Sequence, residues 1–155
     1  NHYIMIESIY LLLDGLYSSQ LRDFLSGYSC QSESFTGANV YNEIGIGTLI
    51  LLALLLGVYY KVIDPAENKR TKWMITMGVS AILAALGASF WAFHSETKGL
   101  IGQCLLKDEQ GNSLINVTDY VGLGISNAII IVVLFILFSI LVARYFSTNN
   151  RYTPF

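Results

Sequence analysis

Three long runs of apolar residues divide the chain. They cover residues 44–63, 73–93 and 120–146, and no side chain between Val121 and Ala143 is ionisable. A helix rises about 1.5 Å per residue, so about 20 apolar residues cross a hydrocarbon core roughly 30 Å thick. Because lipid cannot hydrogen-bond the backbone, each run is predicted to be helical despite its Ile and Val content. The pattern predicts an all-α, polytopic helical membrane protein.

Residues 3–25 show a different pattern, with ionisable side chains inside an apolar sequence. At about 100° per residue, Glu7, Asp14 and Ser18 lie on one side of a helix, opposite an apolar face. We expect one amphipathic helix, retained in the mature protein because it lacks the basic start of a signal peptide. Two placements are open. It is either a fourth span, which its length favours, or a helix lying flat on the outer leaflet.

Composition indicates a single membrane domain over residues 1–155. Hydrophobic residues make up 54% of the chain and charged residues 13%, against about 25% charged in soluble domains. The outer connections, residues 27–43 and 94–119, are too short for a separate catalytic domain. The loop 64–72 is short enough to make the second and third predicted spans an antiparallel hairpin.

Lys and Arg predict the orientation, because loops that stay in the cytoplasm carry more of them. The loop after residue 60 and the C-terminal tail contain six: Lys61, Lys69, Arg70, Lys72, Arg144 and Arg151. The other side contains three: Arg22, Lys98 and Lys107. The C-terminus is therefore expected in the cytoplasm, and the location is a bacterial inner membrane or a plasma membrane.

The two cysteines lie in the two outer connections. Cys30 follows the N-terminal segment, and Cys104 lies between the last two spans. Oxidising conditions outside the cytoplasm allow disulfides, so a bridge between them is predicted. The alternative is two unpaired thiols, which an inverted orientation would favour.

No group of residues has the spacing of a catalytic or metal site. His2 and His94 are far apart, and neither cysteine belongs to a CxxC motif. The glycines at 45–47 and 122–124 lack the spacing of a phosphate-binding loop and are expected to serve packing. With a net charge of −2 and no basic run, nucleic acid is not an expected partner. We expect no enzyme activity, no metal ion and no cofactor.

Small side chains recur at intervals of three and four in the last two spans. Such faces let helix backbones approach closely. The candidates for helix packing are Gly78, Ala81, Ala85 and Ala88 in one span, and Gly122 and Ser126 in the other. They serve packing within the chain or contact with a second copy, and both uses are open.

Asn127 lies about two turns inside the last span, where its amide needs a hydrogen-bond partner. It either joins helices or faces a lumen together with Asp14 and Ser18.

Two functions of the chain remain open. In one, chains form a homo-oligomeric pore that favours cations, with Glu7, Asp14, Ser18 and Asn127 as pore-lining candidates. In the other, the chain is a non-conducting membrane anchor or scaffold subunit of a larger envelope or secretion complex.

Overall fold

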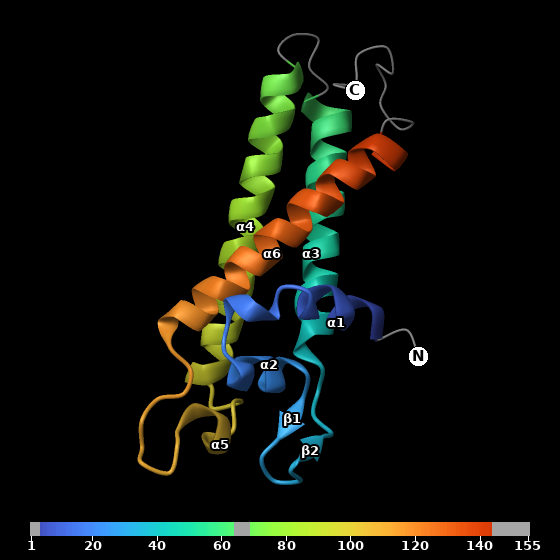
Figure 1. Ribbon diagram of the computed structural model, residues 1–155. Coiled ribbons are helices and arrows are strands. Elements are labelled where there is room, and N and C mark those ends of the chain that lie inside the picture. The colour runs from blue at the N-terminus through green and yellow to red at the C-terminus, as the bar shows by residue number, and fades with distance from the viewer. Residues whose placement is uncertain (1–3, 64–68, 144–155) are drawn as a thin grey trace.

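Three long helices form the body of the computed structural model, which describes residues 4–63 and 69–143 (Figure 1). α3, Val40–Gly57, continues into a π-helical segment, η2, Val58–Ile63. α4 covers Lys69–Thr97, and α6, Val117–Phe138, continues into the π-helical η3, Ser139–Ala143. All three are long and apolar enough to cross a membrane, so the three predicted apolar helices are confirmed.

Polar caps start two of these helices earlier than their apolar runs. At α3, the Asn39 side chain accepts a hydrogen bond from the Asn42 backbone N–H at 3.2 Å. At α6, Asn116 and Asp119 form a capping box. Because these caps satisfy N–H groups that have no partner within the helix, the helices begin at 40 and 117 instead of 44 and 120.

The N-terminal segment is not one helix. It forms α1, Ile4–Leu11, then the 3₁₀ turn η1, Asp14–Leu16, then α2, Ser19–Leu25. The continuous amphipathic helix predicted over 3–25 is therefore wrong, and no described helix in this segment has the length of a span. Asp14 and Ser18 favour turns and caps over helix interiors, and Ser18 indeed caps α2 by accepting from the Leu21 N–H.

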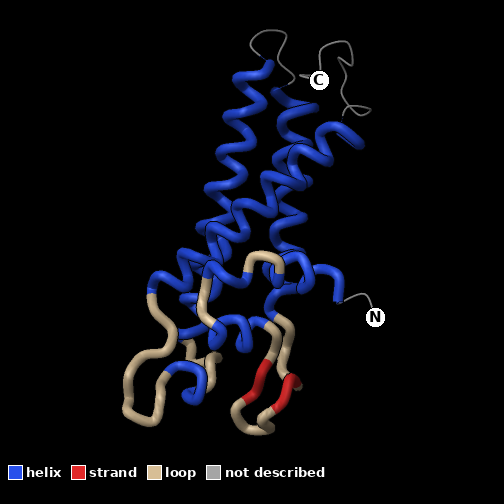
Figure 2. Tube along the Cα trace, in the orientation of Figure 1, coloured by secondary structure: helices blue, strands red, loops and turns tan. Residues whose placement is uncertain are grey.

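The chain before α3 and the connection between α4 and α6 gather at one end of the long helices (Figure 2). They contain the antiparallel strands β1, Tyr28–Ser29, and β2, Ser34–Phe35, and the short helix α5, Gln103–Leu106. Residues 19–39 and 98–116, which include α2, are called the cap below. The small hairpin is an addition to the predicted all-α fold.

Two glycines close the base of this hairpin. The Gly37 N–H donates to the Gly27 carbonyl at 2.8 Å, and Gly27 has a φ of +86°. A Cβ on Gly37 would lie only 2.9 Å from the same carbonyl oxygen. Side chains are therefore excluded from both positions.

The core has two parts. Near the cap, Leu21, Leu25, Tyr41 and Leu123 pack with no exposure to solvent. At the other end, Trp73, Phe135 and their neighbours form a second cluster. Between them the long helices are held mainly by the contact of α4 with α6, and α6 crosses α3 obliquely (Figure 1).

Candidate functional site

Asn127 is the polar centre of the bundle. Its side chain is buried, and its Oδ1 accepts from the Tyr10 hydroxyl at 2.5 Å. The Thr48 hydroxyl lies 3.1 Å from the same oxygen, and Asn127 Nδ2 donates to the Ala84 carbonyl at 2.9 Å. One amide on α6 therefore connects α1, α3 and α4.

Tyrosines attach the N-terminal segment to α3. The rings of Tyr10 and Tyr41 lie 5.1 Å apart, and the hydroxyl oxygens of Tyr17 and Tyr41 are 2.9 Å apart. Burial raises the pKa of Tyr17, so this hydroxyl stays neutral and keeps its proton for hydrogen bonding. α1 is thus fixed across α3 instead of running parallel to it (Figure 1).

The four pore-lining candidates are not brought together. Glu7 accepts from the Asn39 amide at 2.8 Å, and Asp14 lies 3.1 Å from Arg22 in an ion pair. Ser18 caps α2, whereas Asn127 lies inside the bundle. Because η1 interrupts the helix, the polar stripe predicted for residues 3–25 is divided among separate contacts. Within residues 4–63 and 69–143, no three His, Cys, Asp or Glu side chains are placed to hold a metal ion.

Asp119 connects the starts of two helices. One carboxylate oxygen accepts from the Asn116 N–H at 2.7 Å, and the other accepts from the Ser18 N–H at 2.9 Å. A single carboxylate therefore serves the N-terminal ends of both α6 and α2, where a negative charge is favourable.

Small residues make the closest contacts of α6. A Cβ on Gly122 would collide with the Leu16 carbonyl of η1, and one on Gly124 would meet the Ala85 carbonyl oxygen at 2.9 Å. Gly124 lies two residues from Gly122 and is one of the glycines that were expected from the sequence to serve packing. The Ser89 hydroxyl, next to it on α4, donates to the Tyr120 carbonyl at 2.8 Å.

The other packing candidates differ in burial. Ala88 and Ser126 are buried, while Ala81 and Ala85 are half-buried. Gly78 is exposed, and a Cβ built on it would have nothing within 4 Å. Gly78 therefore takes no part in packing within the chain.

Two cavities lie along α3 and α4. The first, about 270 Å³, lies between these helices, with Thr48 and Asn127 among its lining residues. The second, about 480 Å³, lies between the hairpin of the cap and the end of α4. Glu43 and Trp91 line both cavities, so the two adjoin at these residues. Glu43 was not among the residues selected from the sequence.

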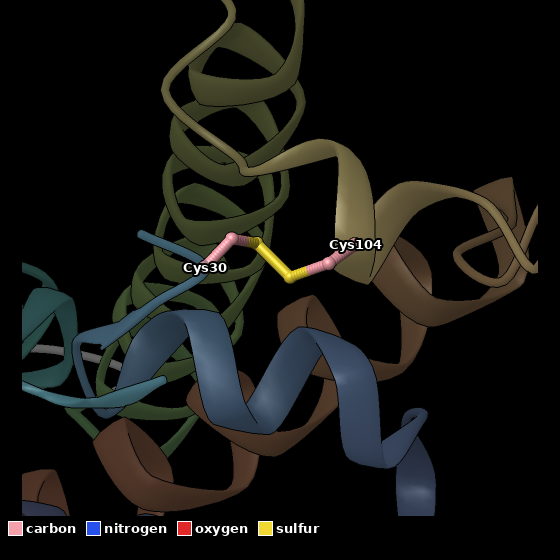
Figure 3. The surroundings of a disulfide bond; sticks show 2 residues. All are labelled: Cys30 and Cys104. Carbon is pink, nitrogen blue, oxygen red and sulfur yellow. A yellow bond between two sulfur atoms is a disulfide. The ribbon is translucent and has the colours of Figure 1, made fainter. Parts of the chain in front are cut away.

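A disulfide joins Cys30 to Cys104, as predicted (Figure 3). Cys30 follows β1 and Cys104 lies on α5, and their Cα atoms are 6.0 Å apart. The bridge therefore ties the connection that precedes α3 to the one between α4 and α6, and Cys30 also lines the larger cavity.

Comparison with models of known protein families, with curated proteins and with solved structures gives no match.

Proposed function

We propose that this chain is an integral membrane protein that crosses the bilayer three times and acts as a non-conducting scaffold or anchor. The support for the membrane location is the length and hydropathy of the spans Val40–Ile63, Arg70–Thr97 and Val117–Leu141. Their surfaces remain apolar where they face away from the bundle, as lipid-facing helices do. Examples are Leu54, Ile82, Leu86 and Leu141.

In this proposal α1, η1 and α2 lie at the outer membrane surface. Leu12 is 82% exposed, and the neighbouring Ile9 and Leu16 are also exposed. These side chains would enter lipid, while the Asp14–Arg22 ion pair stays in water. This corresponds to the interfacial placement of the N-terminal segment.

The cap faces outward in the proposed orientation. The excess of Lys and Arg at the opposite end of the spans favours that end for the cytoplasm. The disulfide supports the same orientation, because disulfides persist outside the reducing cytoplasm.

The hydrogen bonding of Asn127 is the observation that carries the scaffold proposal. A polar side chain that lines a pore must face water, whereas Asn127 is buried and directed to Tyr10 and Ala84 of its own chain. Glu7 and Asp14 are likewise engaged in contacts within the chain. These polar groups thus stabilise one bundle, and over residues 4–63 and 69–143 they form no continuous stripe that could line a lumen.

Self-assembly is the second part of the proposal. The open backbone at Gly78 would let a helix of another copy, or of a partner membrane protein, approach α4 closely. The disulfide-bonded cap would then provide a rigid surface outside the membrane for further partners.

Two measurements on purified protein test the proposal. Light scattering in detergent should give a discrete mass above that of one chain, and planar-bilayer recording should give no current. Gly78→Leu should reduce the assembly, whereas Gly57→Leu, at an equally open glycine on α3, should leave it unchanged. Reproducible single-channel currents would contradict the scaffold proposal and support a pore. A parent protein with the mass of one chain would contradict self-assembly.

A further inference from the structure

The junction of the two cavities is built like a site for an amphiphile. Apolar and small side chains of α3 and α4 form the walls of the inner cavity, including Leu51, Leu83 and Gly87. The outer cavity has polar lining groups from the cap, such as Ser29 and Gln31. The inner groove is therefore almost entirely apolar, and the adjoining outer cavity adds polar groups to a lining that is still mostly apolar.

The polar side chains of the groove, Asn127 and Thr48, need no hydrogen-bond partner from a bound molecule. Asn127 Oδ1 already accepts from Tyr10, its Nδ2 donates to Ala84, and the Thr48 hydroxyl also lies 2.8 Å from the Ile44 carbonyl. Because these groups are satisfied by the chain itself, a hydrocarbon can lie over them without leaving a buried polar group unpaired.

Glu43 supplies the charge at the junction. Among the residues that line the two cavities it is the only one with an acidic or basic side chain (Asp, Glu, Lys, Arg or His), and it is exposed. In the described part of the chain it has no ion pair. A carboxylate in this position attracts a cation and repels an anion.

We propose that the α3–α4 groove holds an acyl chain of a membrane lipid whose protonated amine headgroup pairs with Glu43 in the outer cavity. Glu43 lies between the almost entirely apolar inner groove and the outer cavity that carries the polar lining groups, and this order matches that of tail and head in such a lipid lying in the outer leaflet. The outer cavity, about 480 Å³, is within the size range of small-molecule sites, about 300–1,000 Å³, and the inner cavity, about 270 Å³, is slightly below it. The site would fix the lipid beneath the disulfide-bonded cap.

The proposal rests on the proposed membrane location, but not on assembly or on the absence of current. Native mass spectrometry of the detergent-purified chain tests it with two phospholipids of identical acyl chains. One has an ethanolamine headgroup, which carries a protonated amine, and the other has a glycerol headgroup and is anionic. The parent protein should retain one ethanolamine lipid per chain, with at least tenfold preference over the anionic lipid. Equal retention of the two lipids, or retention of neither, would overturn the proposal.

Two variants test separately the contact with the lipid headgroup and the contact with the acyl chain. Glu43→Gln should abolish the preference, while Glu109→Gln, an exposed acid of the cap outside both cavities, should leave it unchanged. Gly87→Leu should displace both lipids because its side chain would fill the groove. The fold should tolerate this change, since a Cβ on Gly87 meets nothing within 4 Å. Gly57→Leu is the matched control outside the cavities. A preference that survives Glu43→Gln, or retention that survives Gly87→Leu, would contradict the assignment.

Discussion

A single amide, that of Asn127, joins elements that are far apart in the sequence. Its partner Tyr10 is 117 residues away, and Thr48 is 79 residues away. Each bond between helices in a membrane contributes modestly, on the order of 0.6–2 kcal/mol, but several bonds on one group make its loss more costly. The stability of the bundle should therefore be sensitive at this residue.

Asn127→Leu is expected to lower the free energy of unfolding by about 1–3 kcal/mol, since the buried Tyr10 hydroxyl loses its acceptor. Tyr10→Phe, which removes only one of the bonds, should cost less. The double variant should be little worse than Asn127→Leu alone, because both changes remove the same bond. Reversible unfolding in mixed micelles measures all three. Fully additive losses would show that the two residues are not coupled.

One added methyl group should have opposite effects on stability at two glycines, Gly124 on α6 and Gly78 on α4. Gly124→Ala should destabilise by about 1–3 kcal/mol, because its Cβ would press on the Ala85 carbonyl of α4. Within one chain Gly78→Ala has open space, so in the dissociated chain it should be neutral or stabilising by up to about 1 kcal/mol, since alanine favours the helix. The same unfolding assay compares them. Equal effects would contradict the packing of α4 against α6.

At the scale of elements, hydropathy was sufficient to predict the long helices but not to predict the break in the N-terminal segment. The apolar runs identify α3, α4 and α6 because lipid-crossing helices need only length and hydropathy. Residues 3–25 fit a helical wheel equally well. Their break depends on the Ser18 cap and on contacts with Asp119 and Gly122, which are more than 100 residues away. Helical periodicity carries no information about such contacts, and for the same reason it could not reveal the role of Glu43 at the cavity junction.

Asp119→Ala should loosen the starts of two helices at once. The Ser18 and Asn116 amides would both lose their acceptor, and loss of a cap costs about 0.5–2 kcal/mol. Hydrogen exchange at both amides should become faster, while Thr118→Ala, at the exposed neighbouring position, should change neither. Faster exchange at Asn116 alone would mean that the contact with α2 is dispensable.

For the whole molecule, the disulfide is the covalent link between the two halves of the cap. It closes a loop with a sequence separation of 74, which corresponds to a stabilisation of roughly 4 kcal/mol in the chain-entropy model. Replacing both cysteines by serine should lower the unfolding midpoint by this mechanism and expose the hairpin to protease. Mass spectrometry of unreduced, alkylated protein checks the bond itself. Two alkyl adducts per chain without reduction would contradict it.

The orientation of the molecule determines whether the Cys30–Cys104 bond and the proposed lipid site face the oxidising side of the membrane. The described part of the chain contains no free cysteine, so single cysteines can be introduced as markers without removing the native pair. Thr71→Cys lies at the start of α4, and Glu109→Cys lies in the cap, and both positions are exposed. An impermeant thiol reagent added to intact cells should label only Glu109→Cys, and Thr71→Cys should react only after the membrane is opened. The reverse pattern would place the cap in the cytoplasm, where a disulfide would not persist and where the lipid of the outer leaflet could not reach Glu43.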